Sequence, residues 1–154
     1  MRIREAVPGD ADAIASLKVR AWRAAYDGIL SDLDRLDAVR EVAGWRGYIE
    51  DRPADDRLWL AEENGAVVGY ARTGGGEVHG LYVDPDLIGT GIGRALFEFA
   101  VADLRDRGAE SVVVWHFVGN DRAAAFYERA GFTLDGARKA SDFGVDEVRR
   151  RRTW

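Results

Sequence analysis

The spacing of apolar residues predicts helices in the first third of the chain. Ile14, Leu17 and Ala21 recur at intervals of three and four, as on one face of a helix. Apolar residues within 38–49 recur at intervals of four, three and four, which predicts a second amphipathic helix. Residues 3–7 form a short predicted strand in front of both helices.

Polar and small residues set the predicted ends of these helices. Asp10 is expected to cap the first one, because its carboxylate can accept hydrogen bonds from the exposed N–H groups of the first turn. The segment 22–37 is predicted to be irregular, since Gly28 and Ser31 interrupt it.

After Pro53 the period changes to two, which is typical of strands. Residues 57–62 and 67–72 form a predicted hairpin, because the Asn-Gly pair between them favours a type I′ turn. Three consecutive glycines at 74–76 are expected to be a flexible connection, followed by a strand at 77–83.

The second half of the chain alternates helices and strands. The remaining predicted elements are a helix from Ile92 to near Gly108, a strand at 111–117, a helix opened by Asn120 and ended by Gly131, and strands at 132–134 and 145–153. The strand at 111–117 is apolar on both faces apart from His116, which indicates a central position covered on both sides. The element order indicates a mixed α/β sheet, with parallel pairing around the turn before Ile92.

Composition bounds the class of protein. With 154 residues, 47% of them hydrophobic and 32% charged, the chain is predicted to form one globular domain over residues 1–154. The absence of cysteine excludes disulfides, thiolate nucleophiles and cysteine metal sites, and the two histidines are too few for a metal cluster. No apolar run approaches the length of a membrane span and no signal peptide opens the chain, so a cytoplasmic location is expected, without membrane partners. The net charge of −5 disfavours nucleic acid as a partner and favours cationic substrates such as amines.

The most informative segment runs from Leu81 to Gly93 and reads Leu-Tyr-Val-Asp-Pro-Asp-Leu-Ile-Gly-Thr-Gly-Ile-Gly. A strand that ends at Pro85, followed by three alternating glycines and a helix, leaves N–H groups uncovered where an anion can bind. A P-loop is excluded because Gly93 is followed by Arg-Ala, and the glycine spacing G-x-G-x-G does not fit a dinucleotide fingerprint. A phosphate site and a plain tight connection remain the two interpretations.

Three segments resemble the GNAT superfamily of N-acetyltransferases. They are the opening Ile-Arg-Glu-Ala with Gly-Asp at 3–10, the strand and glycine turn at 81–96, and the sequence Asn-Asp-Arg-Ala-Ala-Ala-Phe-Tyr-Glu-Arg-Ala-Gly-Phe at 120–132. The likeness spans nearly the whole chain in the right order. It implies a partly splayed sheet of about seven strands flanked by about four helices, opened between the strands at 77–83 and 111–117.

The resemblance also implies a binding site for acetyl-CoA as co-substrate. The pantetheine arm would lie in the opening of the sheet and bond to the strand backbone, and the pyrophosphate would lie on the glycine turn. The implied cofactor-binding residues are Leu81, Tyr82, Val83, Gly89, Thr90, Gly91, Ile92, Gly93, Arg94, Asn120 and Arg122. The chain departs from the family at Ile88, where Gln or Arg is usual, so a polar side chain is missing there and Arg94 is a candidate replacement.

Acetyl transfer to an amine needs a base and an acid. The resemblance implies that Tyr127 is the acid that protonates the departing thiolate, although Tyr127 could instead serve only in packing. Glu77 and His79 lie two apart on one predicted strand and are both candidates for the base, with Glu77 preferred. A solvated glutamate is the alternative for Glu77, and His116 is expected to be a core histidine.

The predicted function is direct transfer of an acetyl group from acetyl-CoA to a primary amine in a ternary complex, because no cysteine can hold the acetyl group. The acceptor class stays open, and the family resemblance allows a homodimer. A non-catalytic acyl-CoA-binding module is the alternative, and a nucleotide-dependent oxidoreductase is disfavoured by the glycine spacing. Trp22, Tyr26 and Trp45 could form either an aromatic acceptor wall or part of the core. The arginines at 149–152 are expected on a solvated edge strand.

Overall fold

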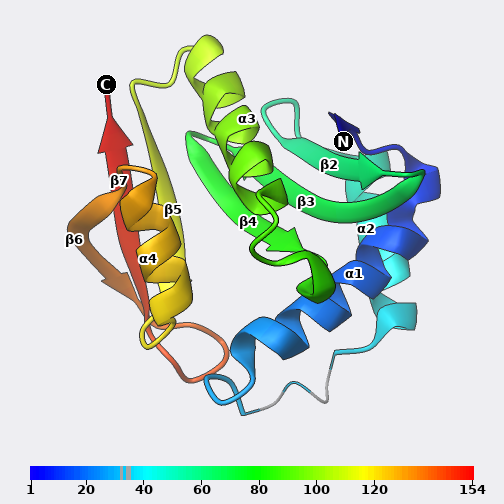
Figure 1. Ribbon diagram of the computed structural model, residues 1–154, viewed down its shortest axis with the longest axis horizontal. Helices are drawn as coiled ribbons and strands as arrows, with labels where there is room; N and C mark the ends of the chain where they lie inside the picture. The colour runs from blue at the N-terminus through cyan, green and yellow to red at the C-terminus, as the bar shows by residue number, and fades with distance from the viewer. Residues whose placement is uncertain (32, 34–35) are drawn as a thin grey trace.

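A computed structural model describes residues 1–31, 33 and 36–154. These residues form one seven-stranded sheet and four α-helices (Figure 1). The helices are α1 (Ala11–Tyr26), α2 (Ala38–Glu50), α3 (Ile92–Asp106) and α4 (Asp121–Arg129). The strands are β1 (Arg2–Glu5), β2 (Arg57–Glu63), β3 (Ala66–Gly74), β4 (Glu77–Val83), β5 (Ser111–Phe117), β6 (Thr133–Lys139) and β7 (Glu147–Thr153). Strand number, helix number and element order agree with the prediction.

The sheet opens between β4 and β5. Its strand order is β1-β2-β3-β4-β5-β7-β6, and β4–β5 is the parallel pair between two antiparallel halves. These two strands pair only at Glu77 with Val113 and at Val78 with Val114. Beyond this point they diverge, as Figure 1 shows, so the edge of β4 that faces β5 is left without a strand partner.

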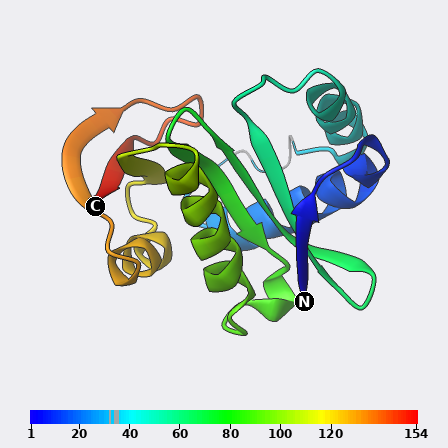
Figure 2. The same cartoon turned by 90° about the horizontal axis from the view of Figure 1, so that it is seen from above.

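Helices cover the two faces of the sheet. Helices α3 and α4 lie on one face and α1 with α2 on the other (Figure 2). Phe97 of α3 packs with Val112, Val114 and Phe132 in a core cluster beneath α3 and α4. A second cluster, centred on the buried Tyr70, packs α1 against β2 and β3. The first cluster also includes Val78 of β4, so burial of these side chains joins the two halves of the sheet.

A β-bulge lies where the sheet begins to open. Arg72 pairs with Gly80 and Thr73 pairs with Val78, so His79 is the extra residue on β4. A bulge re-aims the side chains that follow it. As a result, Val78 and Leu81 both pack against the cluster around Phe97, whereas Tyr82 packs on the α1 face.

The predicted turn at residues 64–65 is confirmed, whereas the predicted flexible connection at 74–76 is wrong. Asn64 and Gly65 have φ values of 53° and 80°, as a type I′ turn requires. The expected flexible connection at 74–76 is instead a tight turn, since Gly74 ends β3 while Gly75 and Gly76 turn with φ values of 60° and 74°.

Two predictions about the first helix are wrong. Helix α1 continues to Tyr26 through the first part of the segment expected to be irregular, because Tyr26 is buried and packs against Phe117. The rest of that segment includes residues 32, 34 and 35, which lie outside the described part of the chain. Asp10 does not cap α1: its carboxylate accepts hydrogen bonds from Arg4 and from the Val7 N–H, because the Arg4 guanidinium offers a stronger, bidentate partner.

The arginine-rich strand is not an edge strand. β7 lies between β5 and β6, so its arginine side chains have a neighbouring strand on both sides. Arg149 and Arg151 both contact Asp135 of β6, whereas Arg150 on the opposite face is only 5% exposed. The prediction failed because strand order, which depends on tertiary pairing, does not follow from local sequence.

Candidate active site

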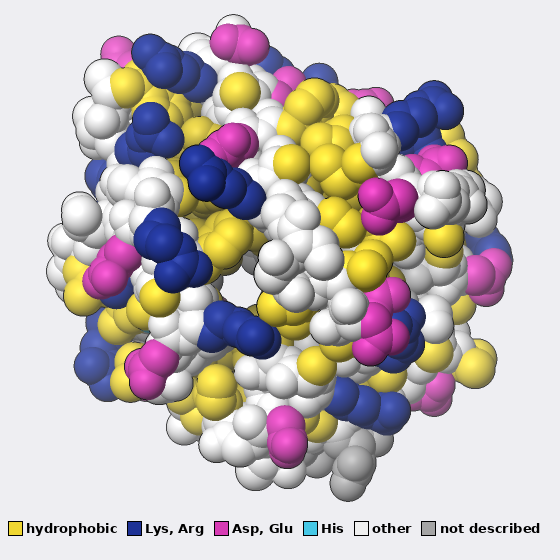
Figure 3. Space-filling model, in the orientation of Figure 1, with side chains coloured by type: hydrophobic (Ala, Val, Ile, Leu, Met, Phe, Trp, Pro, Cys, Tyr) yellow, Lys and Arg dark blue, Asp and Glu magenta, His cyan; other side chains and the backbone are white. Residues whose placement is uncertain are grey.

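A cleft of about 1530 Å³ occupies the opening of the sheet. It is lined by α1, β4, the start of α3, β5, α4 and residues 139–147, so segments far apart in the sequence contribute to it. The space-filling view shows a hollow in the middle of this face, with Lys and Arg side chains around it (Figure 3). Its volume exceeds that of an ordinary small-ligand pocket, which suits an elongated ligand together with a second molecule.

The turn before α3 presents backbone N–H groups to the cleft. Gly91 is the N-cap of α3, with φ 91° and without a side-chain cap, and Gly89 has φ 85°. The first intrahelical bond in this turn runs from Ala95 N–H to Gly91 C=O. The N–H groups of Ile92, Gly93 and Arg94 therefore have no partner within the helix, and N–H groups at a helix N-terminus can bind an anion.

The side chains of this turn offer few polar groups in fixed positions toward the cleft. The Thr90 hydroxyl donates to Leu87 C=O, so it serves the turn itself. Arg94 is exposed and pairs with Glu98, while Ile88 is 43% exposed. A Cβ on Gly93 would lie 3.3 Å from the Val83 side chain, so this glycine lets α3 pack closely on β4. Binding here depends on backbone geometry.

Strand β4 also offers backbone to the cleft. Leu81 and Val83 turn their side chains toward α3, and Tyr82 turns its ring to the other face, where its hydroxyl lies 2.8 Å from that of Tyr26. The unpaired edge of this strand remains for an extended ligand, as in β-augmentation. The expected pantetheine contacts at residues 81–83 stay a prediction, and this part of β4 has no pairing with β5.

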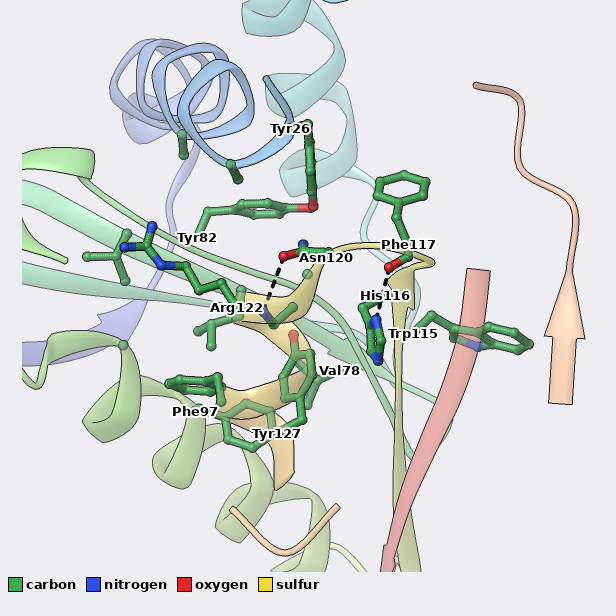
Figure 4. A pocket seen from close by; sticks show the side chains of 18 of the residues that line it. Tyr26, Val78, Tyr82, Phe97, Trp115, His116, Phe117, Asn120, Arg122 and Tyr127 are labelled. Carbon is green, nitrogen blue, oxygen red and sulfur yellow. Dashed lines mark hydrogen bonds between the residues drawn. The ribbon is translucent and has the colours of Figure 1, made fainter. Parts of the chain in front are cut away.

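The N-terminus of α4 also lines the cleft. Asn120 caps α4 by accepting from the Ala123 N–H at 3.2 Å, as predicted (Figure 4). Arg122 is exposed and lines the cleft, as does Arg129. Arg94, Arg122 and Arg129 thus place positive charge at the end of the cleft that the starts of α3 and α4 form.

Tyr127 lines the cleft between these elements. Its ring packs against Phe97 at 5.4 Å and lies nearly parallel to that of His116, with 6.3 Å between centroids (Figure 4). Burial, with a smaller contribution from Tyr26, raises the pKa of Tyr127 well above its ordinary value. The phenol therefore stays protonated at neutral pH.

Glu77 and His79 lie together, as the spacing predicted, but they engage each other. The Nδ1 of His79 lies 2.7 Å from the Glu77 carboxylate and its Nε2 lies 3.1 Å from Gly74 C=O. Both ring nitrogens therefore lie next to oxygen acceptors of Glu77 and Gly74, so the ring is engaged within its own strand and turn. Burial acts to raise the pKa of Glu77, but the His79 bond, Lys139 and Trp115 together lower it.

Glu147 is a cleft residue that the sequence did not single out. It is the first residue of β7, pairs with Phe117 of β5, and lies 4.0 Å from the Lys139 ammonium. Burial raises its pKa, Lys139 opposes this, and the negative charge of Glu77 adds to it. No local pattern marks Glu147, because its place follows from the interior position of β7.

Aromatic side chains cover the end of the cleft near Glu147. Trp22 contacts Tyr26 at 5.0 Å and Phe143 at 5.6 Å, and these three residues line the cleft while packing on one another. Trp45 does not line it, since it packs on Tyr70 at 5.3 Å. Trp22 and Tyr26 thus both pack together and line the cleft, so an acceptor wall at these residues stays a prediction, and Trp45 belongs to the core.

His116 is not simply a core histidine. It is half-buried, lines the cleft beside Tyr127, and accepts a hydrogen bond at Nε2 from the Nε of Arg150 at 2.9 Å. Burial and the Arg150 charge outweigh the Phe117 carbonyl and Glu128, so its pKa is lowered. The neutral ring is therefore part of the wall next to Tyr127.

The part of the chain that the structure describes contains neither a candidate membrane-spanning helix nor a group of metal ligands. Within residues 1–31, 33 and 36–154, none of the helices has the length and apolar character needed to span a membrane. In the same part of the chain, no group of three or more His, Asp and Glu side chains is placed to hold a metal ion.

Solved structures of acetyltransferases share this fold. The PaiA N-acetyltransferase from Thermoplasma acidophilum, in complex with coenzyme A, superposes with a TM-score of 0.79 at 16% identity over 99% of this chain and 98% of that one. YncA from Salmonella typhimurium, with acetyl-CoA, gives 0.74 at 24% identity over 99% and 93%. At such identities the likeness establishes the fold.

Sequence relatives point to the same group. The mycothiol acetyltransferase of Propionibacterium freudenreichii is 37% identical over 126 residues, which cover 67% of this chain but only 40% of that protein. This chain thus spans less than half the length of that relative. The protein named Probable N-acetyltransferase from Mycobacterium tuberculosis is 29% identical over 88% of this chain and 82% of its own length. The profile of the Acetyltransferase (GNAT) family matches residues 17–132, and the chain belongs to this family.

Proposed function

We propose that this protein transfers an acetyl group from acetyl-CoA directly to a primary amine within a ternary complex. The observation that carries the proposal is that the uncapped N-terminus of α3 and the phenol of Tyr127 line one cleft. Acetyl-CoA supplies the acetyl group as an activated thioester when bound. The absence of cysteine supports direct transfer, since no thiolate is available to carry the acetyl group.

The cofactor half of the cleft is proposed to bind and orient the co-substrate. The N–H groups at the start of α3 hold the diphosphate, the open edge of β4 holds the pantetheine arm, and Arg122 adds a positive charge at the rim. A strand N–H near Val83 is suited to polarise the thioester carbonyl as negative charge develops on its oxygen.

The acceptor half of the cleft is proposed to bind an ammonium group and remove its proton. Glu77, Asp142 and Glu147 line this part of the cleft and outnumber the single Lys139. The lowered pKa of Glu77 keeps it ionised to attract the ammonium, and the raised pKa of Glu147 makes it the better matched proton acceptor. This division modifies the expectation that the base is Glu77 or His79, with Glu77 preferred.

The acetyl transfer itself joins the amine to the acetyl group and releases the CoA thiolate. The neutral amine nitrogen bonds to the thioester carbon, the carbon–sulfur bond breaks, and the thiolate takes the proton of Tyr127. The proton lost by the new amide nitrogen leaves through the carboxylates and the phenol regains its proton from solvent. The products are an acetylated amine and free CoA thiol.

The test is thiol release from acetyl-CoA in the presence of separate amines. The panel includes a peptide amine, a lysine peptide, a polyamine, an aminoglycoside and the acceptor of mycothiol acetyltransferases, which is chosen because those relatives share the family. Amine-dependent release is expected for one class. If acetyl-CoA binds by calorimetry but every amine is silent, the acyl-CoA-binding alternative replaces this proposal, and loss of binding as well would contradict both.

A further inference from the structure

Arg150 is a buried cation in a run of four arginines whose other members are partly or fully exposed. Only 5% of its surface is exposed, and its side chain lies on the face of the sheet that carries α4. Burial of a charge is costly unless it is paired and hydrogen-bonded. Its partners therefore indicate what this charge holds in place.

The partners of Arg150 surround Tyr127. The Nε donates to His116 Nε2 at 2.9 Å, and one terminal nitrogen donates to the Glu128 carboxylate at 3.2 Å and to Phe132 C=O at 3.4 Å. Glu128 follows Tyr127 in α4, and the Phe132 N–H donates to Tyr127 C=O at 2.9 Å. One guanidinium thus joins β7 to β5, to α4 and to the turn after α4.

The bond from Arg150 also fixes the protonation of His116. Because Nε2 accepts from a guanidinium that stays charged, the ring proton must lie on Nδ1, which is 3.1 Å from Phe117 C=O and can donate to it. The ring is then held neutral and in one orientation, next to Tyr127 and nearly parallel to it at an angle of 27° (Figure 4).

We propose that Arg150 and His116 are positioning residues for Tyr127: Arg150 holds His116 as the neutral Nδ1–H ring, and this ring sets the direction of the phenol. The inference rests on the proposed acetyl transfer, in which Tyr127 donates the proton. Neither residue touches the acetyl group, so both act through Tyr127.

A double-mutant cycle tests this inference. His116→Ala is expected to lower kcat by about 10- to 100-fold, since a displacement of about 1 Å in a reacting group costs up to about 10²-fold, with the KM for acetyl-CoA unchanged. In the Tyr127→Phe background the same change should have no further effect, because the phenol it positions is gone. Arg150→Met should follow the same pattern. Equal losses in both backgrounds, or no loss in either, would overturn the proposal.

Arg151→Met is the matched control. Arg151 lies on the same strand, pairs with Asp135 and Ser111, and does not line the cleft. Its substitution should leave kcat within about twofold, because neither of its two partners lines the cleft. A loss equal to that of Arg150→Met would show that β7 as a whole, and not the Arg150–His116 pair, matters.

A measurement without turnover separates this inference from the proposed function. The chain has only two histidines, so His79→Gln assigns both imidazole signals in an NMR titration. The nitrogen shifts of His116 should show the Nδ1–H tautomer, and Arg150→Met should raise its pKa, because Glu128 of α4 and the Phe117 carbonyl then face it without the opposing cation. An Nε2–H tautomer in the wild type would overturn the inference even if acetyl transfer is active, whereas a silent thiol assay with the Nδ1–H tautomer would overturn only the function.

Discussion

The two halves of the cleft are built in different ways. The cofactor half consists of backbone: the uncapped turn before α3 and the unpaired edge of β4, with exposed arginines at its rim. The acceptor half consists of side chains, namely carboxylates from β4 and β7 and aromatic rings from α1 and residues 140–146. Tyr127 lies where the halves meet.

A site made of backbone can stay the same when neighbouring side chains change, whereas a site made of side chains changes with each substitution. Backbone N–H groups bind the same diphosphate with almost any neighbouring side chains, which is why Ile88 in place of a polar residue is compatible with the site. A carboxylate or an aromatic ring can be exchanged by one substitution, so on the proposed function the acceptor half would set specificity.

Tyr127→Phe, at the junction, should have the largest effect. Loss of the phenol proton removes general-acid help and should lower kcat by about 10²–10⁴-fold, while the ring keeps its packing against Phe97. Acetyl-CoA affinity should not change, which calorimetry can check. A variant within a few-fold of wild type would leave Tyr127 with a packing role only.

Glu147→Gln should affect the acceptor half. Glu147 is the proposed proton acceptor, so its loss should lower kcat with the amine by about 10²-fold, the low end for a general base because Glu77 remains in the cleft, without a change in acetyl-CoA affinity. Initial rates at varied amine concentration measure this. If the KM for acetyl-CoA rises instead, the two halves are not separate.

The same substitution should change stability with pH. Because burial raises the pKa of Glu147, the folded state favours its neutral form, and this favourable contribution is lost as pH rises through the folded-state pKa. Glu147→Gln should therefore raise Tm at neutral pH, by no more than about 2–4 °C. The gain should vanish below the ordinary value of 4.5, and thermal melts at both pH values decide this.

Gly91→Ala should affect the cofactor half. Gly91 has φ 91°, and a side chain in such a conformation costs about 1–2 kcal/mol, so the turn should relax and weaken acetyl-CoA binding by about 5–30-fold. Gly136→Ala is the control, because Gly136 has φ 90°, open space for a Cβ and no place in the cleft. Both should lose similar stability, but equal losses of affinity would show that Gly91 acts only through stability.

Arg122→Ala should have the smallest effect. An exposed arginine at the rim attracts phosphate through screened charge, so the KM for acetyl-CoA should rise only about 2–3-fold. The difference should shrink at high salt, since the Debye length falls to about 3 Å at 1 M. A difference that persists at high salt would indicate a direct, desolvated phosphate contact.

The cofactor half could be predicted from the sequence because it is local. Pro85, three alternating glycines and an amphipathic helix lie within one continuous segment, and the helix begins at Ile92 as expected. The Asn120 cap and the pairing of Glu77 with His79 were likewise readable from spacing. Acetyl-CoA contacts at these residues remain predictions.

The acceptor half could not be predicted in the same way because it is assembled by tertiary pairing. Glu147 enters the cleft only because β7 lies between β5 and β6, and Arg150 is buried for the same reason. Read locally, four successive arginines are typical of a solvated strand. Asp10 shows a different limit, because Arg4 of the nearby strand β1 binds the carboxylate that a cap would use.

The most direct test is a grid of initial rates in which acetyl-CoA and the amine are both varied. If the two halves bind their substrates at the same time and Tyr127 acts between them, double-reciprocal lines for the wild type should intersect. Tyr127→Phe should lower the maximal rate but keep the intersecting pattern. Parallel lines would mean that an acetylated enzyme forms before the amine binds, which contradicts direct transfer in a chain without cysteine.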